Sequence, residues 1–129
     1  MKYLLTVLCL AVTIGIAHAG DATLTWTAPF DSSGVSKYDM RYSLTKPDTT
    51  SQATKDLWWT ATTTVVVPNM PTPTAAGSTQ SVILLGLKAG SYYFVIRSKD
   101  IYNNWSDWSN VALKFIVESQ PPIRIIDLR

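Results

Sequence analysis

Residues 87–100 read LKAGSYYFVIRSKD and combine a tight turn with the longest strand-like run of the chain. Gly90 closes the turn, because glycine marks sharp changes of chain direction. Residues 91–99 follow, rich in the aromatic and β-branched side chains that favour strands. This stretch predicts a β-protein organised around one long strand.

Working outward, the rest of the chain shows the same pattern of short strands. Alternating apolar and polar residues predict four more strands, at residues 23–27, 37–43, 81–87 and 110–117. Pro and Gly interrupt the chain about every ten residues, as in an all-β sandwich or barrel. No segment has a sustained helical period. We expect a polar loop at 45–56, a strand-like run at 57–67 and an extended, proline-rich connection at 68–79.

The N-terminal residues 1–19 have the pattern of a secretory signal peptide. Lys2 precedes an uncharged apolar run, and Ala17-His18-Ala19 matches the small-x-small site of signal peptidase. The run is short for a membrane span, so an anchor is the weaker interpretation. We expect a secreted chain that begins at Gly20 and has no membrane span.

Composition argues against several functions for that mature chain. Removing residues 1–19 from 129 leaves 110 residues, enough for one domain, and 10 basic against 9 acidic residues. This balance gives no support for a nucleic-acid partner. Cys9 and His18 are the one Cys and the one His, and both leave with the signal. We therefore predict no disulfide, no Cys or His nucleophile or metal site, no cofactor and no enzyme.

The strands together resemble a fibronectin type III domain over about residues 23–117. The stretch 24–29, LTWTAP, resembles the second strand of that family, whose tryptophan (here Trp26) packs in the core. The stretch 38–43, YDMRYS, is similar to the third strand. The resemblance implies an all-β fold, a two-sheet antiparallel Greek-key sandwich.

The stretch 87–100 looks like the Leu-x-Pro-Gly turn and following strand of the family. Leu87 is in place, and Ala89 stands where the proline usually does. The resemblance implies a corner tyrosine, Tyr92, whose hydroxyl ties the turn to the backbone. Alternation along the strand then places one set of side chains inside, Tyr92, Phe94 and Ile96, and another set outside, Arg97 and Lys99.

Residues 105–109, WSDWS, resemble the Trp-Ser-x-Trp-Ser box best known from cytokine receptors. In such domains tryptophans and arginines stack as a ladder on the outer face of the sandwich. Each contact between a cation and a ring contributes about 0.5–1 kcal/mol when exposed. We expect the tryptophans to cover the cations in a ladder formed by Trp105, Trp108, Arg97, Lys99 and Arg41. We interpret the box as a brace for the last strand, with a receptor-like ligand site as the alternative.

Three further features have both a functional and a structural interpretation. Asn104 begins a glycosylation sequon, which matters only in a host with that machinery. Trp58 and Trp59 could stack on a sugar, but we expect one ring in the core and the other over an edge. Calcium would need several acids to meet at one end of the sandwich, and these acids lack clustered spacing: Asp31, Asp100 and Asp107.

The tail at residues 119–129, SQPPIRIIDLR, resembles the first strand of the family, which is missing before Leu24. In one interpretation the tail enters the vacant edge of the next molecule, and repetition of this contact gives a filament. In a second, the chain is a fragment cut inside a second domain. In a third, the tail is disordered or folds back, which its short connection makes difficult. The donor side chains would be Ile123, Ile125, Ile126 and Leu128.

The sequence thus predicts three segments: a signal peptide (1–19), a fibronectin type III-like domain (20–118) and a strand-like tail (119–129). We predict a secreted, non-catalytic module for extracellular adhesion or structure, whose partners are proteins, including other copies of itself. The alternative is a ligand- or carbohydrate-binding accessory module, or the N-terminal part of a longer surface protein.

Overall fold

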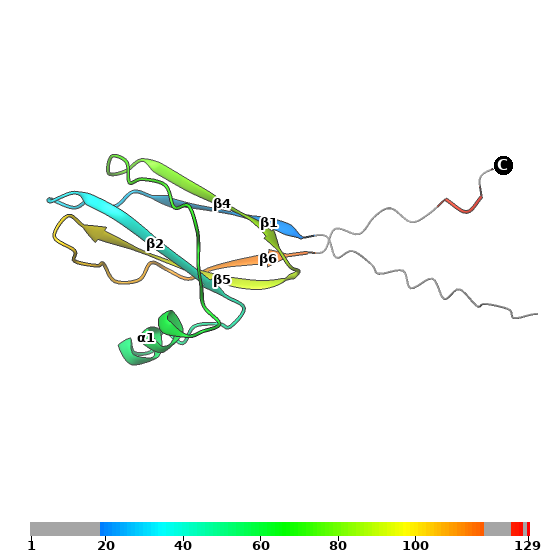
Figure 1. The fold of residues 1–129 in the computed structure, drawn as a ribbon, viewed down its shortest axis with the longest axis horizontal. Coiled ribbons are helices and arrows are strands. Elements are labelled where there is room, and N and C mark those ends of the chain that lie inside the picture. The colour runs from blue at the N-terminus through cyan, green and yellow to red at the C-terminus, as the bar shows by residue number, and fades with distance from the viewer. Residues whose placement is uncertain (1–18, 118–124, 128) are drawn as a thin grey trace, which may run out of the picture.

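Two antiparallel sheets face each other, and their strands lie where the sequence alternates. The computed structural model describes residues 19–117, 125–127 and 129. One sheet pairs β1 (Gly20–Thr27) with β4 (Thr79–Leu87). The other sheet has the order β3 (Val65–Val66), β2 (Val35–Ser43), β5 (Gly90–Asp100), β6 (Ala112–Ile116). The prediction of two antiparallel sheets is therefore confirmed, with the addition of one short helix, α1 (Gln52–Thr60) (Figure 1).

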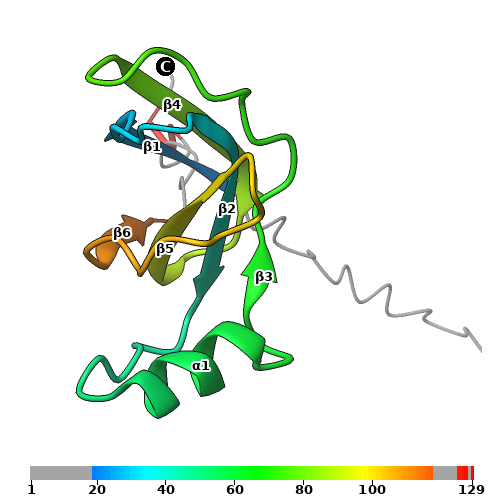
Figure 2. The same cartoon turned by 90° about the vertical axis from the view of Figure 1, so that its left-hand side faces the viewer.

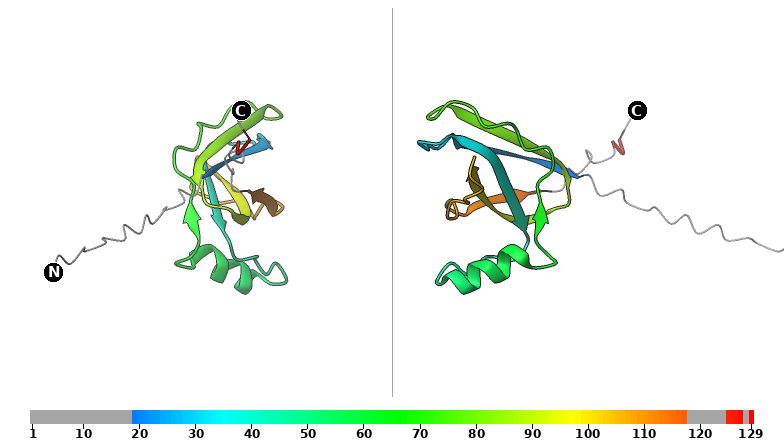
Figure 3. Two further views of the ribbon diagram at one scale, coloured as in Figure 1. Left: turned by 90° about the vertical axis from the view of Figure 1, so that its right-hand side faces the viewer. Right: turned by 60° about the vertical axis from the view of Figure 1, so that its left-hand side comes forward.

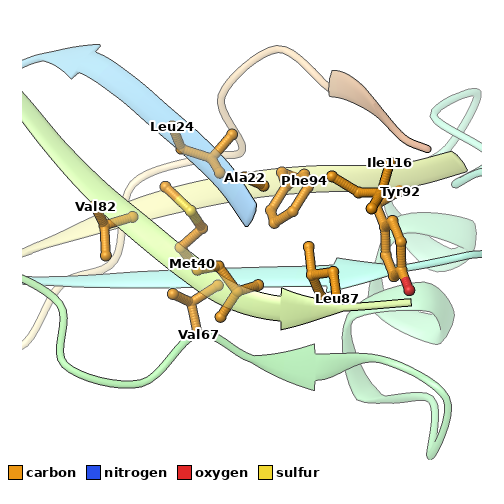
Figure 4. Close-up of a cluster of buried hydrophobic side chains, with 10 residues drawn as sticks. Ala22, Leu24, Met40, Val67, Val82, Leu87, Tyr92, Phe94 and Ile116 are labelled. Atoms are coloured by element: carbon orange, nitrogen blue, oxygen red, sulfur yellow. The ribbon is translucent and has the colours of Figure 1, made fainter. Parts of the chain in front are cut away.

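Alternation along the strands decides which side chains enter the core. In β1, Ala22 and Leu24 are buried, whereas the threonines between and beyond them are exposed. Phe94 in the centre of β5 is only 2 % exposed. Figure 4 shows side chains from the two sheets pointing toward one another. The buried cluster consists of Ala22, Leu24, Met40, Val67, Val82, Leu84, Leu87, Tyr92, Phe94 and Ile116.

The two sides of the sandwich differ. On one side, residues 67–78 cross from the four-stranded sheet to the two-stranded sheet (Figure 2). On the other side, β1 and β6 are edge strands of their sheets, and among the described residues no strand lies between them. We call this side the seam.

The two ends of the sandwich also differ. β1 begins where β6 ends: a Cβ atom placed on Gly20 would lie 2.7 Å from Cγ2 of Ile116. We call this end the terminal pole. The loops at 28–34 and 101–104 lie at the other end, the loop pole, because Val35 pairs with Asp100 there (Figure 1).

The helix α1 spans the end of the predicted loop (45–56) and the start of the predicted strand (57–67), so both predictions are wrong there. Ser51 caps the helix: its Oγ accepts a hydrogen bond from the Thr54 N–H at 3.1 Å, while Thr54 Oγ1 accepts one from the Ser51 N–H. Trp58 and Trp59 are both buried. A strand would direct two consecutive side chains to opposite faces, whereas a helix can turn both toward one surface.

α1 covers part of the outer face of the four-stranded sheet, on the side away from β1 and β4 (Figures 2 and 3). Its two tryptophans pack with Val95, which is 1 % exposed, and form a second, smaller core on that face. Within the described residues, no helix is long and apolar enough to cross a membrane.

Candidate functional site

A ladder of cations and tryptophans runs across the outer face of the four-stranded sheet. The Lys99 ammonium lies 5.5 Å from the ring centre of Trp105. The guanidinium carbon of Arg97 lies 5.2 Å from Trp105 and 4.1 Å from Trp59. The guanidinium carbon of Arg41 lies 4.4 Å from the other rung, Trp59. Cations from two strands, β2 and β5, therefore alternate with the rings of Trp59 and Trp105, as expected for cation–π stacking.

The expected position of Trp108 in this ladder is wrong. Its ring centre lies 5.4 Å from that of Trp58 and 5.8 Å from that of Trp59, and Lys55 lies 5.8 Å above it. Trp59 takes the rung between Arg97 and Arg41 because α1 presents it there. The sequence did not predict this rung, because residues 57–67 have the propensity of a strand and Trp59 lies in a helix.

Hydrogen bonds hold Arg41 in the ladder, whereas Arg97 is partly buried and stacked against two rings. Arg41 Nη2 and Nε donate to the two carboxylate oxygens of Asp39 at 2.9 and 3.1 Å, and Nη1 donates to the Trp59 carbonyl at 2.9 Å. Burial lowers the pKa of Arg97. The Arg97 Nε is buried without a hydrogen-bond partner among the described residues, and the Asp39 carboxylate favours the charged form of its guanidinium.

The two serines of the WSDWS segment form hydrogen bonds with the edge of β5, in the stretch of chain before β6 begins. The Ser106 N–H donates to the Ser98 carbonyl at 2.8 Å, and the Ser106 Oγ accepts from the Ser98 N–H at 3.0 Å. Ser109 does the same with Ile96, with both distances 3.0 Å. Each serine thus satisfies two backbone groups of an exposed strand edge, which accounts for the segment structurally.

Tyr92 makes the corner hydrogen bond that the resemblance implies, whereas Trp26 packs against the buried cluster from the seam. The Tyr92 hydroxyl donates to the Lys88 carbonyl at 2.9 Å, across the turn that joins β4 to β5. Leu87 is buried. Trp26 is half-buried and packs edge-on against Tyr38, with ring centres 5.2 Å apart.

The three acids considered for calcium instead accept hydrogen bonds from backbone N–H groups one or two residues away. The Asp100 carboxylate accepts three hydrogen bonds from Tyr102 and Asn104, which lower its pKa. Asp107 accepts from the Trp108 N–H and forms an ion pair with Lys55, and its pKa is also lowered. Asp31 accepts from Ser33. Among the described residues, no three His, Cys, Asp or Glu side chains group around a metal position.

The expectation of one core ring and one edge ring at Trp58 and Trp59 is also wrong. Trp58 is 6 % and Trp59 is 5 % exposed, so neither ring offers a face to a sugar. The Trp58 indole N–H is satisfied by the Thr45 carbonyl at 2.7 Å. Both residues are structural, and a carbohydrate site on these rings is not supported.

Two hollows of the surface lie along the seam. A hollow of about 90 Å³ opens there onto the core. A second hollow of about 370 Å³ continues from it between the end of β1 and residues 106–110. Trp26 lines both, and its indole Nε1 is buried without a hydrogen-bond partner among the described residues. The apolar lining of the smaller hollow includes Leu24, Trp26, Met40, Phe94, Ile96 and Ala112.

The edge of β1 along the seam carries unpaired backbone groups. The Ala28 N–H donates to the Ser78 carbonyl at 2.8 Å, so even-numbered residues of β1 direct their backbone groups toward β4. The N–H and C=O groups of Thr23, Thr25 and Thr27 then point away from β4, toward the seam. A two-stranded sheet is marginal by itself, and a third strand on this edge would stabilise it.

The predicted donor residues lie partly outside the described structure. Ile125 and Ile126 are 76 % and 82 % exposed and belong to no strand. Ile123 and Leu128 lie outside the described residues, as does most of the predicted signal peptide. The described part of the tail therefore presents apolar side chains to solvent.

Comparisons with family models, with curated proteins and with solved structures find no match to this chain.

Proposed function

We propose that this protein is a secreted, non-catalytic module of the fibronectin type III kind, with Greek-key connections, and that it acts in extracellular adhesion or structure by self-assembly. In the proposed assembly, residues 121–129 of one copy lie in the seam of the next copy and pair with β1. The observation that carries this proposal is the seam, where an unpaired strand edge lies beside an uncovered apolar hollow.

The tail has the chemistry that the seam requires. Main-chain groups of an added strand would form hydrogen bonds with the backbone N–H and C=O groups of Thr23, Thr25 and Thr27 in β1. These bonds supply affinity without sequence preference. Ile123 and Ile125 stand two residues apart and would share one face of the strand, toward the hollow. Arg124 would face solvent between them. Covering the exposed Ile125 side chain adds the hydrophobic gain that favours binding.

Strand polarity supports assembly between copies. A donor strand antiparallel to β1, as in the first strand of the family, would enter the seam at the loop pole. Each chain leaves its own β6 at the terminal pole, beside Gly20. The donating end of one copy and the entry point of the next are thus different surfaces, so the contact is heterologous and repeats into a filament.

The first test compares the solution mass of residues 20–129 with that of residues 20–118, by light scattering after size separation. The shorter form keeps every strand, α1 and the buried cluster, so we expect it to fold as a monomer. We expect the longer form to make large species whose mass rises with concentration. Two stable monomers would refute strand donation.

A second test isolates the donor side chain. Ile125→Asp in the full mature chain should abolish the large species, because it places a charge against the hollow. The matched control, Arg124→Ser, alters the solvent-facing neighbour and should assemble as the parent does. A peptide of residues 119–129 should raise the Tm of the 20–118 form, and the Ile125→Asp peptide should not.

A further inference from the structure

We propose that the loop pole of each copy docks against the terminal pole of the preceding copy, so that the assembly has a second, pole-to-pole interface besides the donated strand. This inference rests on the proposed function. The occupant of the loop pole is a second copy of this chain.

The loop pole exposes large apolar side chains on two adjacent loops. Phe30 is 84 %, Ile101 58 % and Tyr102 71 % exposed. The two loops are held side by side, because the Ser36 Oγ at the start of β2 donates to the Asp100 carbonyl at 2.9 Å. Large exposed apolar side chains on neighbouring loops are typical of a protein contact surface.

Hydrogen bonds fix the shape of the second loop in advance. The Asp100 Oδ1 accepts from the Tyr102 and Asn104 N–H groups at 2.8 and 2.9 Å, and the Asp100 N–H donates to the Asn104 carbonyl at 3.0 Å. Asn103 adopts a left-handed conformation with φ 68° that completes the turn. Ile101 and Tyr102 are therefore presented to solvent on a preorganised loop, which lowers the entropic cost of docking.

The terminal pole exposes apolar side chains of its own. Val117 is 78 % and Leu44 60 % exposed. They share this pole because Gly90, whose Cβ position would lie 2.9 Å from Cδ2 of Leu44, pairs with Ile116 at the end of β6.

The length of the connection brings these two poles together. In the proposed assembly, the chain leaves one copy at Val117 and reaches the next copy's seam by Ile123. These six residue steps span at most about 20 Å at roughly 3.4 Å each, and residues 121 and 122 are both proline, which stiffens the connection. A donor strand that enters at the loop pole thus places the loop pole of one copy next to the terminal pole of the other.

The test uses two paired serine variants of residues 20–129. Ile101→Ser with Tyr102→Ser removes the apolar loop tip, and Ile83→Ser with Leu57→Ser removes two exposed apolar side chains from β4 and α1, on the outer faces of the sandwich. We expect the loop-pole variant to need at least ten-fold more protein than the parent to assemble, by light scattering, because truncated interface anchors commonly cost that much or more. The control variant with Ile83→Ser and Leu57→Ser should assemble as the parent does. Equal assembly of all three chains would overturn the pole contact.

The tail peptide separates this inference from strand donation itself. A peptide of residues 119–129 brings no terminal pole, so it should raise the Tm of the 20–118 form equally with and without the loop-pole substitutions. A smaller Tm rise in the substituted form would mean that the loop acts through the seam, and would overturn the pole contact. A parent chain that stays monomeric would refute strand donation, and the pole contact with it.

Cross-linking gives an independent readout, since residues 20–129 contain no cysteine. Tyr102→Cys with Val117→Cys should yield a disulfide-linked ladder of oligomers under oxidising conditions. Ile83→Cys with Val117→Cys, at a position of similar exposure on β4, should not. Equal ladders from both pairs, or none from the first, would contradict the proposed contact.

Discussion

The guanidinium carbon of Arg97 lies 4.1 Å from the ring centre of Trp59, so that a residue of β5 and a residue of α1 meet face to face. A second cation, Arg41, stacks at 4.4 Å on Trp59 and donates to its carbonyl. The helix is thus attached to the sheet by the ladder as well as by the smaller core that its two tryptophans form with Val95.

Trp59→Ala should lower the free energy of unfolding by about 3 kcal/mol, because it removes a buried ring and one rung of the ladder. Leu57→Ala on the same helix is the matched control, since Leu57 is 71 % exposed, and should change stability by less than about 0.5 kcal/mol. Urea unfolding of the monomeric 20–118 form measures both. Similar effects for the two variants would contradict the structural role of Trp59.

Tyr92→Phe should cost about 1 kcal/mol of stability, because the Lys88 carbonyl loses its hydrogen bond while the ring stays in place. Tyr93→Phe is the control on the neighbouring residue, whose hydroxyl makes no hydrogen bond within the described residues. Thermal and urea unfolding of the two variants should differ accordingly. An unchanged stability for Tyr92→Phe would show that the corner bond contributes nothing net.

Ser106→Ala and Ser109→Ala should each lower stability by about 1 kcal/mol, because the Ser98 and Ile96 N–H groups lose their acceptors. Amide exchange measured by NMR should quicken at the corresponding position: Ser98 in the first variant and Ile96 in the second. Ser32→Ala in an exposed loop is the control and should change neither quantity. Unaltered exchange at both amides would contradict the bracing role.

Acid should weaken the fold through the loop-pole carboxylate. Hydrogen bonds to Asn104 and Tyr102 lower the pKa of Asp100 below its ordinary value of 3.8. Its contribution is therefore fully present above about pH 4 and is lost as the pH falls through the lowered pKa. Asp100→Asn should make the free energy of unfolding less dependent on pH below about 4, as followed by urea unfolding at several pH values. Identical pH profiles for variant and parent would refute this contribution.

Local alternation predicted much of the fold from the sequence. The five predicted strands contain or overlap β1, β2, β4, β5 and β6, because a pleated strand places successive side chains on opposite faces whatever its partner. The stacking of Trp105 with Arg97 and Lys99 was implied by the resemblance of residues 105–109 to the Trp-Ser-x-Trp-Ser box. Ile125 and Ile126 are apolar and exposed to solvent. Their insertion into a second copy stays a prediction.

The helix escaped prediction because its signals are weak in the sequence. Ser51 and Thr54 form a cap without the usual Glu or Gln, and the aromatic and β-branched residues of 57–67 favour strands by propensity. Burial of both Trp58 and Trp59 on one surface overrode that propensity. This surface exists only after β2 and β5 have paired, so no local pattern contained it.

The sequence by itself determined five of the strands and which of their faces are apolar, since these depend on neighbours along the chain. The corner tyrosine was implied by the resemblance to the family. Only the tertiary structure decided that Trp59 completes the ladder, that Trp108 leaves it, and that β1 and β6 border an open seam. These features depend on which segments pack together across the sandwich, and packing between distant segments is set by the summed burial of the whole core.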